Sequence, residues 1–157
     1  AMTQPIVILP IALHETDVTA LAGDARREGY LFVDRLVRER AEDSNRFALD
    51  GECFLGARER DALVGIGGLN RVPYAAAREV ARLRHLYIRP TWRCRGIASR
   101  LVSSLIERAL TGSFVTLRLR TDNPDAARLY DGLGFAASVS AQSSHSMQLP
   151  LPRLPPK

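Results

Sequence analysis

A helical pattern set between two strand patterns, over residues 80–120, constrains the fold more than any other feature of this chain. Residues 80–88 read as a strand that stops before Pro90, which cannot donate a ladder hydrogen bond. From Ala98 to Leu110 apolar side chains recur at helical spacing, and Thr111-Gly112 ends the pattern. Residues 114–120 alternate apolar and polar side chains, as a half-buried strand does. This order predicts two parallel strands joined by a right-handed crossover.

The remaining patterns predict a mixed α and β domain. Residues 4–10 indicate a first strand, and residues 17–43 a pair of helices divided near Gly29. Residues 52–57 and 62–70 predict a hairpin around a polar turn at 58–61. Asn123 as N-cap, Pro124 at the first helical position and Gly132 at the stop predict a short helix, followed by closing strands. We expect one domain over residues 2–157, with Ala1 a residue left by expression.

Composition and charge narrow the class of protein. Hydrophobic residues at 46% and charged residues at 25% are ordinary globular values. No apolar run approaches the roughly 20 residues of a membrane span, and the start lacks a secretory pattern. Cys53 and Cys94 are far apart without metal-ligand spacing, so we expect no metal site and a cytoplasmic location. The net charge of +5 indicates an anionic partner, but no recognition-helix or aromatic-interleaved basic pattern favours nucleic acid.

The turn "RCRGIA", between the strand at 80–88 and its helix, has the features of an anion site. A helix start carries unpaired N–H groups and the positive end of the helix dipole. Gly96 leaves the backbone bare there, and Arg93 and Arg95 add positive charge. In open α/β sheets, anionic ligands lie at this carboxyl end of a strand. The alternative is an ordinary loop-to-helix turn with solvated arginines.

Three ordered blocks resemble the GCN5-related N-acetyltransferase (GNAT) family. The family signature is Gln or Arg, two residues, Gly, one residue, then Gly or Ala, and it is present from Arg93 to Ala98. "LRHLYIRPTWR" precedes it and "TDNPDAARLYDGLGF" follows it, so the resemblance covers nearly the whole chain. It implies an α/β (α+β) GNAT-like fold: a central mixed sheet, helices on both faces, and splayed parallel fourth and fifth strands. It also implies transfer of an acetyl group from acetyl-CoA to a primary amine by direct attack.

In such a fold acetyl-CoA would lie in the notch between the splayed strands. Backbone N–H groups of the turn could cradle the pyrophosphate, and strand-edge groups could pair with the pantetheine amides. One of these N–H groups could also polarise the thioester carbonyl. By resemblance, Asn123 would contact the cofactor as well as cap its helix. The expected cofactor residues are Leu86, Tyr87, Ile88, Arg93, Cys94, Arg95, Gly96, Ile97, Ala98, Ser99, Asn123 and Tyr130.

The sequence identifies the residues that would transfer protons less completely than those that would bind the cofactor. In the family, a tyrosine placed like Tyr130 protonates the departing thiolate; packing against the helix is the alternative role. Several members use a glutamate early in the fourth strand as general base, but Arg82 stands there and cannot be a base. His85, Glu79 and a water relay remain, with His85 the first side-chain candidate and the water route favoured over it. The missing glutamate makes an inactive acyl-CoA-binding module the alternative function.

The acceptor is not identified by the sequence, and a small molecule and a protein both remain open. The resemblance implies an acceptor site shaped by the first helices and the second-to-third strand region, here Tyr30, Phe32, Arg35, Asn70 and Tyr74. A set of arginines alternates on neighbouring strands, and either salt bridges or attraction of an acidic acceptor would account for it: Arg82, Arg84, Arg118 and Arg120. The exposed hairpin and closing strands also leave a homodimer as an expectation.

Overall fold

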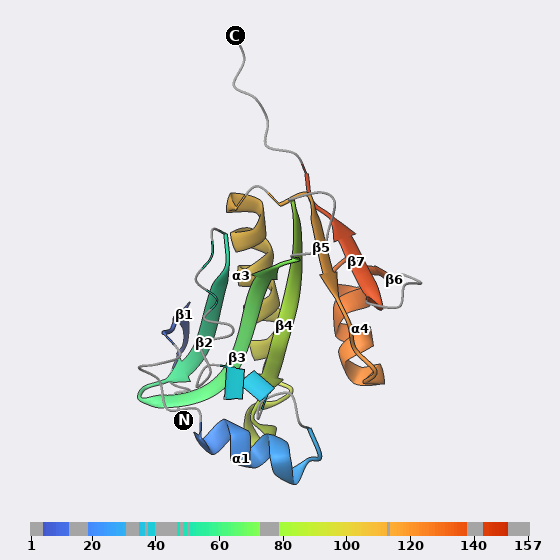
Figure 1. Ribbon diagram of the computed structural model, residues 1–157. Coiled ribbons are helices and arrows are strands. Elements are labelled where there is room, and N and C mark those ends of the chain that lie inside the picture. Colours follow the sequence, from blue (N-terminus) through green and yellow to red (C-terminus); the bar gives the residue numbers. More distant parts are fainter. Residues whose placement is uncertain are drawn as a thin grey trace.

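The computed structural model describes residues 5–12, 19–30, 35–36, 38–39, 47, 49, 51–72, 79–112, 114–137 and 143–150. Within this part of the chain, seven strands form one mixed sheet in the order β1-β2-β3-β4-β5-β7-β6 (Figure 1). The strands are β1 (Ile6–Pro10), β2 (Cys53–Glu59), β3 (Ala62–Arg71), β4 (Val80–Ile88), β5 (Thr116–Leu119), β6 (Ala136–Ala137) and β7 (His145–Gln148). The helices are α1 (Thr19–Arg27), α3 (Ile97–Thr111) and α4 (Pro124–Gly132), with a 3₁₀ turn, η1, at Pro90–Trp92.

Helices cover both faces of the sheet, as predicted. On one face α3 and α4 enclose a core that includes Leu101 and Tyr130 together with Leu83 of β4 and Leu117 of β5. On the other face, α1 buries Leu21, Ala22 and Ala25 against a second cluster from β2, β3 and β4. The long helix forms because its apolar residues recur on one side, and Leu101, Val102, Leu105 and Ala109 are fully buried there. No helix in the described ranges is long and apolar enough to cross a bilayer.

The parallel pairing predicted between β4 and β5 is present but short. Their Cα partners are Val80 with Thr116, Ala81 with Leu117, and Arg82 with Arg118. Past this point β4 continues to Ile88, whereas β5 ends at Leu119, and the two strands separate (Figure 1). The splayed pair expected from the GNAT resemblance is therefore confirmed.

Local boundaries differ from the sequence predictions in two turns. The hairpin turn was predicted at 58–61, but β2 runs to Glu59 and Arg60 turns with a φ of +53°. Gly132, predicted as the stop of the last helix, is its final residue, and Gly134 supplies the positive φ of +99° that ends it. The N-terminal end was predicted correctly: the Asn123 side chain accepts from the backbone N–H groups of Asp125 and Ala126. Most of the second predicted helix lies outside the described residues.

Candidate functional site

β4, the strand that borders the splay, has a bulge in its ladder with β3. The register between β3 and β4 shifts between Ile66 and Gly68, because His85 and Leu86 of β4 oppose the single residue Gly67 of β3 there. His85 lies within the shift and has a φ of +59°, unusual for a residue with a side chain. Such a bulge leaves the local ladder incomplete and bends the strand. On its other side β4 forms no ladder pair with β5 beyond Arg82, so the segment from Leu83 to Ile88 borders the splay, where a ligand could pair as a strand would.

The turn at the far end of this edge has an open backbone. Gly96 is the N-cap of α3 with a φ of +77°, and among the described residues no side chain caps the helix there. A Cβ placed on Gly96 would meet no atom within 4 Å. Cys94, two residues earlier, also has a positive φ, of +62°, and is exposed. Backbone N–H groups in the first turn of α3, at Ile97, Ala98 and Ser99, thus face a space where an anion could approach.

Positive charge at this turn is divided between two arginines with different surroundings. The Arg95 guanidinium lies over the Trp92 ring, 4.8 Å from its centroid. The Arg93 guanidinium instead pairs with Glu28, the residue after α1, through two hydrogen bonds of 2.6 and 2.7 Å, and its Nε donates to the carbonyl of Ile88 at 3.0 Å. The predicted phosphate contact of Arg93 stays a prediction, because in this structure its side chain holds the end of β4 against α1.

The sequence did not predict that acidic residues of α1 and of the turn after it would pair with arginines of this region. Glu28 also accepts a hydrogen bond from the Tyr87 hydroxyl, and Asp24 accepts one from Arg89 at 2.7 Å. Hydrogen bonding from Arg93 keeps the pKa of Glu28 low despite its partial burial, and Arg89 does the same for the pKa of Asp24. Asp24 and Glu28 are four residues apart on one helix face, and that spacing was the available signal.

Asn123 and Tyr30, predicted for the cofactor and acceptor sides, are brought together. The Asn123 Nδ2 donates to the Tyr30 hydroxyl at 3.1 Å. Tyr30 follows α1 on one face of the sheet, and its ring meets that of Tyr87 edge to face at 6.3 Å. Asn123 caps α4, which packs on the other face. The bond between them therefore joins elements of the two faces beside the separated strands.

Tyr130 is a buried aromatic residue on α4, 4% exposed. Its ring packs against Phe135 at 5.5 Å and His145 at 6.1 Å. Burial raises the pKa of its hydroxyl well above the ordinary value of 10.0. The phenol therefore stays protonated at neutral pH, as a proton donor must.

His85 is also buried, with its ring edge to face against Phe47 at 5.9 Å. Burial lowers the pKa of its imidazole to about 3, with further lowering by the nearby Arg84, Arg35 and Arg82. An imidazole with so low a pKa is neutral at pH 7 but accepts a proton weakly. Burial and positive charge thus make His85 a poor general base.

The predicted acceptor residues are only partly described. Asn70 is buried; its Nδ2 donates to Glu52 at 3.0 Å, and its Oδ1 receives a long 3.5 Å contact from Arg84. These contacts give Asn70 a role in holding β3 to its neighbours. Phe32 and Tyr74 lie outside the described residues. Within the described ranges, no three His, Cys, Asp or Glu side chains gather in a way that could hold a metal ion.

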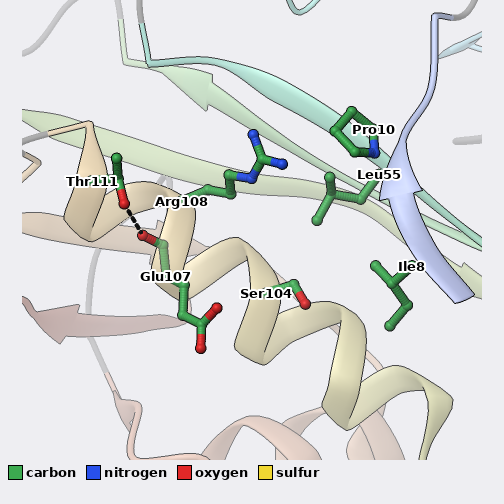
Figure 2. Close-up of a pocket in the computed structure, with 7 residues that line it drawn as sticks. All are labelled: Ile8, Pro10, Leu55, Ser104, Glu107, Arg108 and Thr111. Atoms are coloured by element: carbon green, nitrogen blue, oxygen red, sulfur yellow. Dashed lines mark hydrogen bonds between the residues drawn. The ribbon is translucent and has the colours of Figure 1, made fainter.

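Two surface cavities lie along the side of α3 that faces β1, the strand at the edge of the sheet. Figure 2 shows one of about 240 Å³ between α3, β1 and β2, where the Thr111 hydroxyl donates to the carbonyl of Glu107. A second cavity, of about 410 Å³, is lined by Ile8, Ser99, Arg100, Ser103 and Ser104. Ser99 is the predicted cofactor residue that lines it, so this cavity adjoins the turn. The candidate site itself is defined by the strand edge and the turn, not by an enclosed pocket.

Comparison with known proteins agrees with this geometry. Residues 19–135 match the model of the Acetyltransferase (GNAT) family. N-alpha-acetyltransferase RimI of Mycobacterium tuberculosis (strain ATCC 25618 / H37Rv) is 32% identical over 135 residues, which are 86% of this chain and 81% of that protein. The uncharacterized protein ML0378 of Mycobacterium leprae (strain TN) is 36% identical over 83 residues, 53% of this chain but only 23% of that longer protein. The crystal structure of a proposed acetyltransferase from Exiguobacterium sp. 255-15 superposes with a TM-score of 0.81 at 25% identity, covering 92% of this chain and 93% of the other.

Proposed function

Because this chain belongs to the GNAT family and is an acetyltransferase that uses acetyl-CoA, we propose that its acceptor is the α-amino group of a peptide or protein N-terminus. The similarity to an N-alpha-acetyltransferase over most of the chain supports this acceptor. The observation that carries the proposal is that Arg82 stands where several family members have a glutamate base, while His85, nearby on the same strand, is buried beside arginines.

We assign acetyl-CoA binding to the turn before α3 and to the edge of β4 that borders the splay. The N–H groups of Gly96, Ile97, Ala98 and Ser99 would hold the pyrophosphate, with the Arg95 charge beside them. The pantetheine arm would run along Leu86, Tyr87 and Ile88, whose side chains pack into the two cores. The arm then points toward Arg82 and Arg118, where β4 and β5 meet. The acetyl group would therefore lie near the closed end of the splay.

The amine must reach the thioester without its extra proton. Arg82 replaces the glutamate found in several family members, and the pKa of His85 is too low for efficient proton removal. An α-amino group has a pKa of about 7.7–8.0, so about a quarter to two fifths of it is neutral at pH 7.5. A lysine side chain, with a pKa of about 10.4, is neutral in about one molecule per thousand. A site that relies on water to receive the proton is therefore suited to an α-amine.

The arginines around His85 would assist this step. Their positive charges disfavour any further cation nearby, and for this reason they lower the pKa of His85. An ammonium bound in the same field would lose its proton to solvent more readily. After attack, the protonated Tyr130 hydroxyl would supply a proton to the departing CoA thiolate, while the attacking nitrogen releases a proton to solvent and the phenol regains one from solvent. A backbone N–H at the bulge would polarise the thioester carbonyl.

A two-part assay tests the proposed function. Peptides with a free N-terminus would be incubated with acetyl-CoA and the protein, and the modified atom would be located by mass spectrometry. Matched peptides with a blocked N-terminus and one internal lysine, together with a polyamine, provide the comparison. We expect kcat/KM for the α-amine to exceed that for the lysine at least a hundredfold at pH 7.5. Acetylation of the lysine or polyamine at an equal rate would refute the assignment, and binding of acetyl-CoA without turnover would indicate the inactive module instead.

A further inference from the structure

A row of polar side chains crosses the sheet at the closed end of the splay. Arg82 of β4 pairs with Asn70 of β3 on one side and with Arg118 of β5 on the other. Directly paired residues place their side chains on the same face of a sheet. Asn70, Arg82 and Arg118 therefore share one face, and Arg82 and Arg118 form the last pair before the strands separate.

This face is the one that α1 covers in part, opposite the long helix. Ala81, Leu83, Leu117 and Leu119 belong to the core beneath α3 and α4. Side chains alternate along a strand, so the arginines between them point the other way. The same alternation places Arg84 and Arg82 together along β4. The guanidinium groups thus line the surface from which an acceptor can reach the end of the pantetheine arm without crossing α3.

The cluster is strongly positive. Arg82 is half-buried, and burial together with the charges of Arg84, Arg120 and Arg35 lowers the pKa of its guanidinium. Four like charges this close impose an energetic cost that a bound anion would relieve. Among the described residues, a carboxylate approaches the cluster at Arg84, where Glu39 Oε1 lies 3.8 Å from the guanidinium. That distance is beyond a normal hydrogen bond, so this contact is a loose ion pair.

We propose that this arginine cluster, defined as Arg35, Arg82, Arg84, Arg118 and Arg120, binds a carboxylate of the acceptor and so selects peptides with an acidic residue close behind the N-terminal one. Planar guanidinium groups match carboxylates in two-point hydrogen bonds, which makes arginine suited to this recognition. The amine would then lie at the thioester while the acidic side chain is held at Arg82 and Arg118. This inference rests on the proposed function, since it names the class of N-terminus acetylated.

Peptide substitution in the wild-type protein tests the inference without altering the fold. Three peptides would share an N-terminal alanine and differ at positions two and three: Asp-Glu, the neutral isosteres Asn-Gln, and Lys-Arg. We expect kcat/KM for the acidic peptide to be at least about tenfold above the neutral one and about a hundredfold above the basic one at low salt. The advantage should shrink as ionic strength rises. Equal rates for all three would overturn the acidic preference and leave N-terminal acetylation standing, whereas no acetylation of any peptide would overturn both.

Charge removal locates the effect. Arg118→Gln should raise the KM of the acidic peptide about tenfold and change that of the neutral peptide less than about twofold, with kcat nearly constant. Arg60→Gln, in the exposed turn between β2 and β3, removes the same charge away from the splay and should retain the wild-type preference. A preference lost equally in both variants would show that net charge acts rather than the cluster. A preference unchanged in Arg118→Gln and in a second variant, Arg82→Gln, would also overturn the assignment.

Discussion

Substitution of Gly96 separates the stability of the turn from its function. Gly96 adopts a φ of +77°, and a Cβ added there would meet no atom within 4 Å. Gly96→Ala therefore introduces no clash within the protein, and its cost to folding is the left-handed strain of about 1–2 kcal/mol. For a chain of this length about 1 kcal/mol lowers Tm by about 2–4 °C. The new methyl group lies where the pyrophosphate would approach the backbone, so acetyl-CoA affinity should fall at least about tenfold, or about 1.4 kcal/mol.

Gly134 provides a matched control for this prediction. It has a φ of +99° and ordinary van der Waals space, with Met147 Cε at 3.6 Å from the added Cβ. Gly134→Ala should therefore show a comparable loss of stability in urea unfolding but bind acetyl-CoA as the wild type does in calorimetric titration. If the two variants bound acetyl-CoA equally well, the turn at Gly96 would not be a phosphate cradle.

Three further predictions concern single side chains. Tyr130→Phe keeps the packing and removes the hydroxyl, so kcat should fall about a hundredfold or more with acetyl-CoA affinity nearly unchanged; a wild-type kcat in a chemistry-limited reaction would assign Tyr130 to packing alone. Because the folded pKa of His85 is about 3 against an ordinary 6.5, the unfolded chain binds more protons between these values, and stability should decline as pH falls from 6.5 to 4.5. His85→Gln should flatten that decline, by up to about 1.4 kcal/mol per pH unit, in unfolding titrations; an unaltered slope would contradict the burial argument. Glu28→Gln should weaken acetyl-CoA binding about two- to fivefold, because Arg93 would no longer fix the end of β4 beside the turn, whereas Glu59→Gln on the hairpin should have no effect on the titration.

The elements that bear the site could be predicted because their signals are local. The periodicity of α3, the proline after β4 and the Asn123 cap each lie within a few residues of the feature that they specify. The hairpin turn was predicted to begin too early because Arg60, which has the positive φ, is not a residue type that favours such a φ. Gly134 was overlooked in favour of Gly132 because two glycines close together offer the same signal.

The chemistry of the site depended on contacts that local patterns do not contain. Arg93 pairs with Glu28, which follows a helix far earlier in the chain, and no local pattern around Arg93 points to that partner. The low pKa of His85 arises first from burial, which the sequence of the strand alone does not give, and then from Arg84 and Arg82 on the same strand and Arg35 elsewhere. The arginine alternation was visible in the sequence, but its position at the last β4–β5 pair became clear only from the register.

The short junction between β4 and β5 also divides the sheet mechanically. The strands β1, β2, β3 and β4 form one part of the sheet, and β5, β7 and β6 form the other. Three Cα pairs join the two parts, while β3 and β4 share a ladder over most of their length. Opening this junction separates fewer residue pairs than opening the β3–β4 or the β5–β7 ladder, so the sheet should divide there more readily than on either side. A cofactor paired with both sides would act as an additional strand between the two parts. Its binding should then slow amide hydrogen exchange across β5 and β7 more than within β2 and β3, a ligand-dependent stiffening that originates in the length of one ladder.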